Sequence, residues 1–332
     1  YTSFWWEFRV TDRASLDMIE KRRGQKLFQR RFRHCVGIVI LAFLAAGQAA
    51  IAQPGEKVQL DYEGKKLNGW LTEVDSPRAT VLMIHGTMAH ANMEIMTTFA
   101  EVLAEYDIES LRVTLSLGED DREGMYDCAA EHRHTHTGAT GEIAAWMDWL
   151  AREGRDDVIL LGHSRGTNQV MRFSARHAPD RAAGVVLVAP FVYRARAVSV
   201  DYEETAGQPL APILERAQAL VDEGKGDTIL DGVHLLYCPG ADVTADSFLS
   251  YYRDDGDFDT LALAAAGTAP VLVIVGTEDP ISAGVAEAVT AGDADDRISL
   301  LMVEGAGHFF RDLYTYDVVE GIVAWLDSVQ AE

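Results

Sequence analysis

The sequence predicts an α/β protein in which a mostly parallel, eight-stranded sheet carries helices on both faces. Short apolar runs alternate along the chain with amphipathic helical segments, which is typical of a parallel sheet with crossover helices. Several of the apolar runs are hydrophobic throughout, as expected for strands that are buried on both faces. Of the 332 residues, 48% are hydrophobic, which is enough for one large core.

The expected strands and helices follow one another in a regular order. Residues 57–64 and 66–74 alternate apolar and polar positions and predict an opening hairpin. The runs that predict buried strands are 80–86, 110–117, 157–164, 183–191, 269–279 and 297–305. The segments that predict helices are 93–107, 141–154, 167–178, 282–291 and 315–329.

The interval from about 192 to 267 interrupts this order. It contains a helical segment, 209–224, and an aromatic-rich segment, 244–252, between two of the expected core strands. The interval is too long for an ordinary connection between elements. We therefore expect it to form a lid that is inserted into a single domain spanning residues 53–332.

The first 52 residues are expected to be an N-terminal extension with a secretory signal peptide. Residues 21–34 contain seven basic residues, and thirteen mostly apolar residues follow them. Ala50 and Ala52 then match an A-x-A-like cleavage site, so cleavage is expected between Ala52 and Gln53. The mature chain would be periplasmic or secreted, with no stable membrane association. The alternative is a membrane anchor formed by residues 36–52, although this run is short for a bilayer span.

The charge is strongly acidic and unevenly distributed. The formal net charge is −23, yet residues 1–52 hold nine basic residues against four acidic ones, which leaves 20 basic against 48 acidic in the remainder. Such a surface repels the phosphates of nucleic acids and anionic lipid headgroups, which argues against both as partners. A small-molecule substrate is the expected partner.

The stretch Gly162-His163-Ser164-Arg165-Gly166 lies between an expected strand and an expected helix. A serine in that context occupies a sharp, strained turn, and the flanking glycines remove side chains that would collide with the neighbouring strand and helix. A serine hydroxyl is a weak nucleophile, so it needs a base within hydrogen-bond reach and an acid that orients the base. Ser164 is therefore the candidate nucleophile.

Two later strand ends supply candidates for the acid and the base. The strand 269–279 ends in Thr-Glu-Asp-Pro, and His308 follows the strand 297–305 in Gly-Ala-Gly-His-Phe. In a parallel sheet these carboxyl ends lie along the same edge as Ser164. The order Ser…Asp…His, with these motifs, resembles the α/β-hydrolase superfamily over residues 57–329, and in particular its lid-bearing serine esterases and serine aminopeptidases.

The resemblance implies the α/β-hydrolase fold and a catalytic triad. Matched residue by residue, Ser164 is the nucleophile, His308 the general base and Asp279 the orienting acid, with Glu278 as the adjacent alternative acid. The resemblance also implies chemistry that needs no metal and no other cofactor.

The same resemblance implies an oxyanion hole built from backbone N–H groups. One donor would be the N–H of Arg165, and the second that of Thr87, or of Met88 if the loop is shifted. His85 precedes this loop in Met-Ile-His-Gly-Thr-Met. We expect it to shape the loop or to border the substrate pocket rather than to act as a second base.

A segment rich in histidine follows the expected strand 110–117. His132, His134 and His136 stand at alternate positions, so in an extended segment they face one side. We interpret them as loop-shaping or substrate-pocket residues. A metal site completed by Glu131 or Asp127 is the alternative.

Cys128 and Cys238 are the two cysteines that remain once the extension is removed. In an oxidising compartment an even pair suggests one disulfide, and two unrelated buried thiols are the alternative.

These observations predict a serine hydrolase that cleaves a carboxylic ester, or an amide, through an acyl-enzyme intermediate. A serine peptidase or acyltransferase with the same triad is one alternative. A non-catalytic binding protein of the α/β-hydrolase fold is another, and metal-dependent chemistry at the histidine segment is a third.

Overall fold

The computed structural model describes residues 55–177, 180–191, 195–292 and 295–330. The predictions on residues 1–52, namely the signal peptide with cleavage between Ala52 and Gln53 and the alternative anchor at 36–52, lie outside these residues. Over the ranges that are described, no helix has the length and apolar character needed to cross a membrane.

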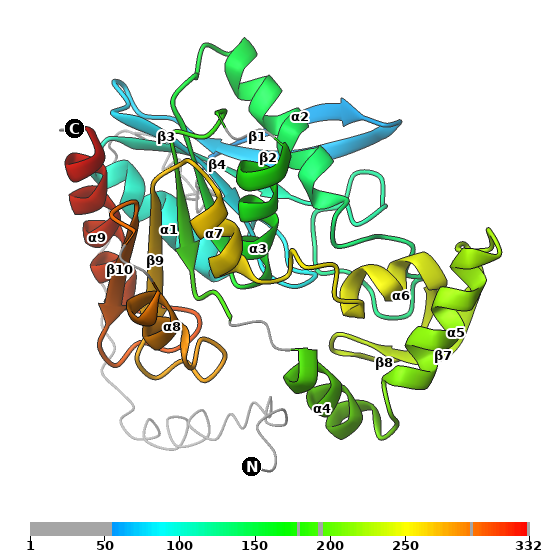
Figure 1. The fold of residues 1–332 in the computed structure, drawn as a ribbon. Coiled ribbons are helices and arrows are strands. Elements are labelled where there is room, and N and C mark those ends of the chain that lie inside the picture. The colour runs from blue at the N-terminus through cyan, green and yellow to red at the C-terminus, as the bar shows by residue number, and fades with distance from the viewer. Residues whose placement is uncertain (1–54, 178–179, 192–194, 293–294, 331–332) are drawn as a thin grey trace, which may run out of the picture. The chain divides into compact units, whose positions relative to one another are not determined.

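Eight strands form one sheet in the order β1-β2-β4-β3-β5-β6-β9-β10 (Figure 1). β2 runs antiparallel to both of its neighbours, β1 and β4, and every other neighbouring pair is parallel. The predicted opening hairpin and mostly parallel sheet are therefore confirmed. The strands are β1 (Glu56–Tyr62), β2 (Lys65–Thr72), β3 (Ala79–Ile84), β4 (Ile108–Thr114), β5 (Val158–His163), β6 (Gly184–Val188), β9 (Val271–Gly276) and β10 (Ile298–Val303).

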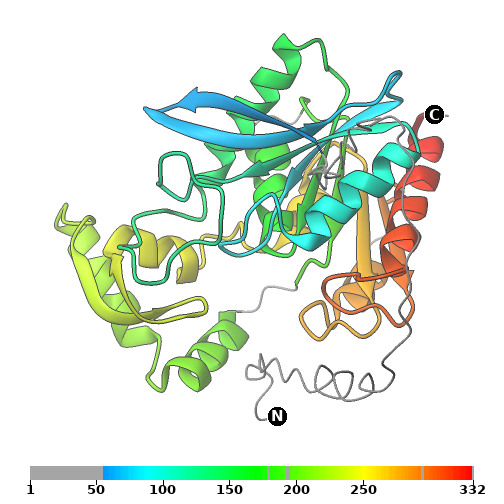
Figure 2. The same ribbon diagram turned by 180° about the vertical axis from the view of Figure 1, so that it is seen from behind.

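Helices cover both faces of the sheet, as predicted. Side chains alternate across a strand, so Leu160 of β5 packs into one layer while Ile159 and Leu161 pack into the other. The first layer contains α2 (Ala139–Arg152), α3 (Arg165–Arg172) and α8 (Val285–Ala291), with Trp146 at its centre. The second contains α1 (Glu94–Glu105) and α9 (Tyr314–Gln330), which lie in front of the sheet in Figure 2.

The chain leaves this frame after β6 and forms an inserted segment. The segment consists of α4 (Ala195–Ala206), α5 (Ala211–Asp222), a hairpin of β7 (Ile229–Leu235) and β8 (Cys238–Thr244), and α6 (Ala245–Tyr252). Its apolar side chains form a cluster together with Met88, Leu117 and Tyr126 from the loops after β3 and β4, and Phe248 is fully buried in this cluster. The predicted helical segment 209–224 corresponds to α5, and the aromatic-rich segment 244–252 forms α6. Neither α4 nor the hairpin was predicted from the sequence.

The insertion ends earlier than the predicted residue 267. The helix α7 (Thr260–Ala266) contacts α3, and its Leu263 and Ala264 are buried in the same layer as Trp146. Because that apolar side of α7 is covered by the core, α7 belongs to the helix layer of the sheet.

Candidate active site

Ser164 occupies a strained turn between β5 and α3. Its φ of 54° and ψ of −119° lie in a backbone region that residues other than glycine rarely adopt. A Cβ on Gly162 would lie 2.4 Å from the oxygen of Gly166, and one on Gly166 would lie 2.5 Å from the oxygen of Ile84 in β3. Both glycines are therefore required for the strand and helix to meet at this angle, and the turn holds the serine at the carboxyl edge of the sheet.

His308 and Asp279 are paired at the same edge. Nδ1 of His308 lies 2.8 Å from Oδ2 of Asp279, and these residues follow β10 and β9 respectively. Asp279 is 5% exposed and also accepts hydrogen bonds from the Ile281 N–H at 2.9 Å and the Ser282 hydroxyl at 2.7 Å. No role for Ser282 was predicted from the sequence.

The environment of Asp279 keeps its carboxyl group ionised. Burial alone would raise the pKa of Asp279, but the hydrogen bonds from His308 and Ser282 outweigh it and hold the pKa below its usual range. The ionised carboxylate accepts the Nδ1 proton of His308, which leaves Nε2 as the basic nitrogen of the ring.

Glu278, the alternative acid, points elsewhere. Its side chain is exposed, and its backbone N–H donates to the oxygen of Ala306 at 3.0 Å. Of the two adjacent carboxylates, the fold brings Asp279 to the histidine.

His163, the residue before the serine, supports the loop that carries His308. Its Nε2 donates to the backbone oxygen of His308 at 3.0 Å, and the two ring centroids lie 5.0 Å apart. His163 is 3% exposed, and burial lowers its pKa to about 4, so the ring is neutral near pH 7. The sequence reading missed this contact, because nothing local to position 163 indicates a partner 145 residues away.

The loop after β3 lies against the serine. A Cβ on Gly86 would lie 3.3 Å from Cβ of Ser164, so the chain passes directly beside this serine as it leads into Thr87 and Met88. Met88 has a φ of 51°, and its carbonyl accepts a hydrogen bond from the N–H of Tyr126 at 3.1 Å. The fold thus brings both predicted oxyanion segments, the loop at 87–88 and the N-terminus of α3, to Ser164.

His85 supports this loop from inside the core. Its Nε2 accepts a hydrogen bond from the N–H of Leu115 at 3.1 Å, which leaves Nδ1–H to donate to the oxygen of Gly86 at 2.8 Å. The side chain is 1% exposed, and burial lowers its pKa to about 3. His85 therefore shapes the loop, and both of its ring nitrogens are occupied.

The three alternate histidines join the core to the inserted segment. His132 Nδ1 lies 3.2 Å from His134 Nε2, and His134 Nδ1 lies 2.7 Å from the hydroxyl of Tyr251 in α6. His136 Nε2 donates to Oδ1 of Asn168 in α3 at 2.7 Å. All three rings are buried.

The other residues considered for a metal site face different partners. The carboxylate of Glu131 accepts two hydrogen bonds from Arg133, and that of Asp127 accepts one from the N–H of Ala129. Across the described ranges, no group of three or more His, Cys, Asp or Glu side chains is arranged to hold a metal ion.

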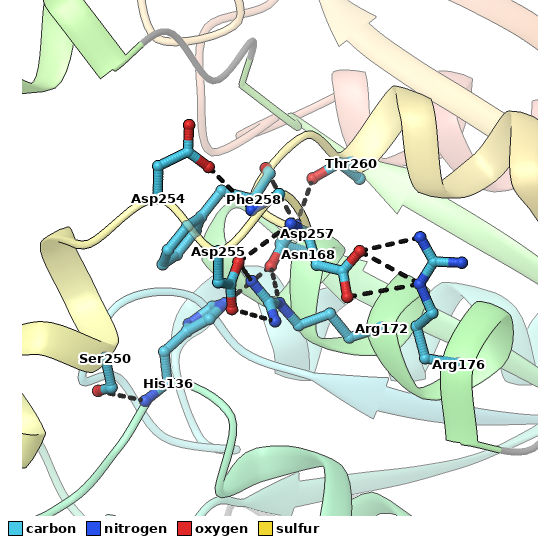
Figure 3. Close-up of polar contacts among 11 residues, drawn as sticks. His136, Asn168, Arg172, Arg176, Ser250, Asp254, Asp255, Asp257, Phe258 and Thr260 are labelled. Carbon is cyan, nitrogen blue, oxygen red and sulfur yellow. Dashed lines mark hydrogen bonds and ion pairs between the residues drawn. The ribbon is translucent and has the colours of Figure 1, made fainter.

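Asn168 anchors the chain where it returns from the insertion to the core (Figure 3). Its amide nitrogen donates to the oxygen of Phe258 at 3.1 Å and to the hydroxyl of Thr260 at 3.1 Å, while its oxygen accepts from His136. One turn further along α3, Arg172 forms a two-pronged ion pair with Asp255, at 2.9 and 2.7 Å. These polar contacts fix the end of the inserted segment against α3, the helix that follows Ser164.

A disulfide adds a covalent link. Cys128 and Cys238 are bonded in the structure with their Cα atoms 5.3 Å apart, which joins the histidine segment to β8. Alongside it, the N–H of His132 donates to the oxygen of Asp242 at 2.8 Å, and the N–H of Thr244 donates to the oxygen of His132 at 3.0 Å.

The buried histidines make the protein sensitive to acid. Burial lowers the pKa of His85, His134 and His136 from 6.5 to about 3, so each is neutral when folded but is protonated near pH 6.5 when the chain is unfolded. Their contribution to stability is therefore complete above pH 6.5 and is lost as the pH falls toward 3. We expect the unfolding free energy to decrease by about 1 kcal/mol per histidine for each pH unit below 6.5.

Urea unfolding at pH 7 and pH 5.5 measures this loss directly. Burial also lowers the pKa of His163, to about 4, so at least four buried rings titrate in this way. Replacing His136 by glutamine keeps a donor for Asn168 but removes one titrating group, so the decrease should shrink by at most about one quarter. An unfolding free energy that does not change between the two pH values would contradict the buried, neutral state of these rings.

The sheet order, the strained turn at Ser164 and the contact between His308 and Asp279 at later strand ends are typical of an α/β hydrolase. Residues 81–319 match the alpha/beta hydrolase family, and the chain belongs to this family. A search of curated proteins finds no match to the sequence.

Solved structures share the fold at low sequence identity. Est1E from Butyrivibrio proteoclasticus is 18% identical with a TM-score of 0.57, and the match covers 84% of this chain and all of that one. A monoacylglycerol lipase from Paleococcus ferrophilus is 19% identical with a TM-score of 0.55, covering 79% and 99%. A soluble variant of monoglyceride lipase from Saccharomyces cerevisiae is 15% identical with a TM-score of 0.57, covering 83% and 96%. At these identities the matches show that the fold is shared.

Proposed function

We propose that the protein is a serine hydrolase that cleaves a carboxylic ester through an acyl-enzyme formed on Ser164. The observation that carries the proposal is the 2.8 Å contact between His308 and a buried, ionised Asp279, on the same sheet edge as a serine held in a strained elbow. Amide substrates share this chemistry and are the second class to test.

In the proposed reaction, each group either transfers a proton or stabilises a charge. His308 Nε2 takes the proton of the Ser164 hydroxyl as the serine oxygen bonds to the substrate carbonyl carbon. The backbone N–H groups of Arg165 and Thr87 donate to the resulting oxyanion. His308 then protonates the departing alcohol, and water, activated by the same ring, releases the acid and restores the serine.

A fluorophosphonate probe tests the nucleophile. The intact protein should form a covalent adduct, and Ser164→Ala should form none. Ser328→Ala serves as the matched control, because this serine lies on the exposed side of α9 and should leave labelling unchanged. Intact protein that stays unlabelled, or Ser164→Ala that still reacts, would show that the protein acts as a non-catalytic binding protein or through another group.

We further propose that the protein works in an oxidising compartment after export. The proposal is supported by the signal-like pattern of residues 21–52 together with the disulfide between Cys128 and Cys238. Sequencing the N-terminus of the mature protein tests it, with Gln53 as the expected first residue. A mature protein that retains residues 36–52 would instead favour the membrane anchor.

A further inference from the structure

Arg165 directly follows the nucleophile and reaches across to the oxyanion loop. It is the first residue of α3, its side chain is partly buried, and its Nε donates to the hydroxyl of Thr87 at 3.2 Å. Thr87 follows Gly86, which lies against Ser164. The guanidinium is therefore held beside the position where the substrate carbonyl would lie.

The inserted segment also contacts the Arg165 side chain. The guanidinium carbon of Arg165 lies 5.5 Å from the ring centroid of Tyr251 in α6, within the range of a cation–π contact. Tyr251 is itself fixed by its hydrogen bond with His134. The Arg165 side chain is thus held by two contacts, one with the loop after β3 and one with the insertion.

No carboxylate is paired with this guanidinium in the described parts of the chain. Its guanidinium contacts one neutral hydroxyl and one aromatic ring, whereas Arg172 in the same helix has a two-pronged pair with Asp255. This is notable in a chain with 52 acidic residues against 29 basic ones. A guanidinium has five N–H donors, and among the described residues Thr87 accepts from one of them.

The physical state of Arg165 favours an incoming anion. Burial lowers the pKa of Arg165, and only the tyrosines Tyr251 and Tyr252 oppose that shift. A partly desolvated cation without a counter-ion gains more from an anionic ligand than a solvated one does. The planar fork of a guanidinium also matches a carboxylate with two parallel hydrogen bonds.

We propose that Arg165 binds a carboxylate of the substrate, so that the preferred substrates are esters that carry a carboxylate near the scissile bond. The inference rests on the proposed serine-hydrolase function and deepens it by naming a substrate class. Arg165 then has two roles: its backbone N–H serves the oxyanion, and its side chain selects the substrate.

Paired substrates test the inference. One series consists of p-nitrophenyl half-esters of dicarboxylic acids from succinate to suberate, which carry the carboxylate on the acyl side. The other consists of 3- and 4-acetoxybenzoate, which carry it on the alcohol side. Each is compared with its neutral methyl ester, and the quantity measured is the ratio of kcat/KM for the anionic substrate to that for its neutral partner.

The wild-type protein should show a ratio of about 10 or more for at least one substrate, as expected for hydrogen bonds to a charged group. Arg165→Gln should reduce this ratio to about 1, and Arg165→Lys, which keeps the charge but loses the fork, should give an intermediate value. Arg176→Gln is the matched control. It removes an equal charge from the helical turn Phe173–His177, which follows α3 and where Arg176 pairs with Asp257. Its ratio should equal that of the wild type.

Because both substrates are measured on the same variant, a general loss of activity or of folded protein cancels in the ratio. A wild-type ratio near 1 in both series would overturn the inference, as would an unchanged ratio in Arg165→Gln.

Wild-type protein provides an independent measurement: glutarate should slow fluorophosphonate labelling at concentrations where neutral glutaramide does not. Equal protection by both compounds, or by neither, would contradict an anion site. If the fluorophosphonate labels the protein but the kcat/KM ratio shows no preference for anionic esters, this inference alone fails. If the protein is not labelled at all, the proposed function fails.

Discussion

Replacing Asp279 by asparagine is expected to lower kcat by about 10⁴-fold while leaving the fold intact. The carboxylate accepts the Nδ1 proton of His308 at 2.8 Å, and in the proposed mechanism this leaves Nε2 as the base. An asparagine of the same shape can present its NH₂ group to Nδ1, which favours the opposite tautomer and places the proton on Nε2. The hydroxyl of Ser164 then has no base to accept its proton.

The neighbouring residue supplies a stringent control for this effect. Glu278→Gln removes an equal charge at the adjacent position, where the side chain is exposed. Its kcat should therefore change by less than about twofold. Ester hydrolysis and melting temperature, measured for both variants, separate catalysis from stability. A large loss of activity in Glu278→Gln with a small one in Asp279→Asn would reverse the assignment of the acid.

The elements that the sequence predicted are those whose determinants are local. The glycines at 162 and 166 are required by contacts within the turn itself and with β3, so the pattern around Ser164 reports the backbone geometry directly. The buried strands were visible because both faces of each strand are covered, which leaves continuous apolar runs. Parallel topology then placed Ser164, Asp279 and His308 along one edge without any knowledge of their contacts.

Other features depend on packing between distant segments and had no local signal. The hairpin β7–β8 has an interrupted burial pattern with register shifts between its strands, so its residues do not alternate regularly. The helix α7 has a short alanine-rich sequence, and only its contact with α3 assigns it to the core rather than to the insertion. The buried state of His136 likewise depends on Asn168, 32 residues further along the chain.

Removal of the disulfide is expected to cause the largest loss of stability. Cys128 and Cys238 are 110 residues apart, and their bond closes a loop that contains β5, α3, β6 and most of the insertion. Such a loop restricts the unfolded chain, so the bond contributes up to about 4–5 kcal/mol to the free energy of unfolding in the chain-entropy view. The double variant Cys128→Ser/Cys238→Ser should lose most of this amount.

Urea unfolding with and without a reductant measures this contribution, and the double variant is its own control. Oxidised wild type should be the most stable form, reduced wild type should approach the double variant, and the double variant should not respond to the reductant. If the stability of the wild type is unaffected by the reductant, although the reagent has full access in the unfolded state, the disulfide is absent.

Because the disulfide joins β8 to the segment that presents His132 and His134 to Tyr251, its loss should also loosen the insertion beside Arg165. We therefore expect the reduced protein to lose its preference for anionic esters at reductant concentrations that leave the sheet folded.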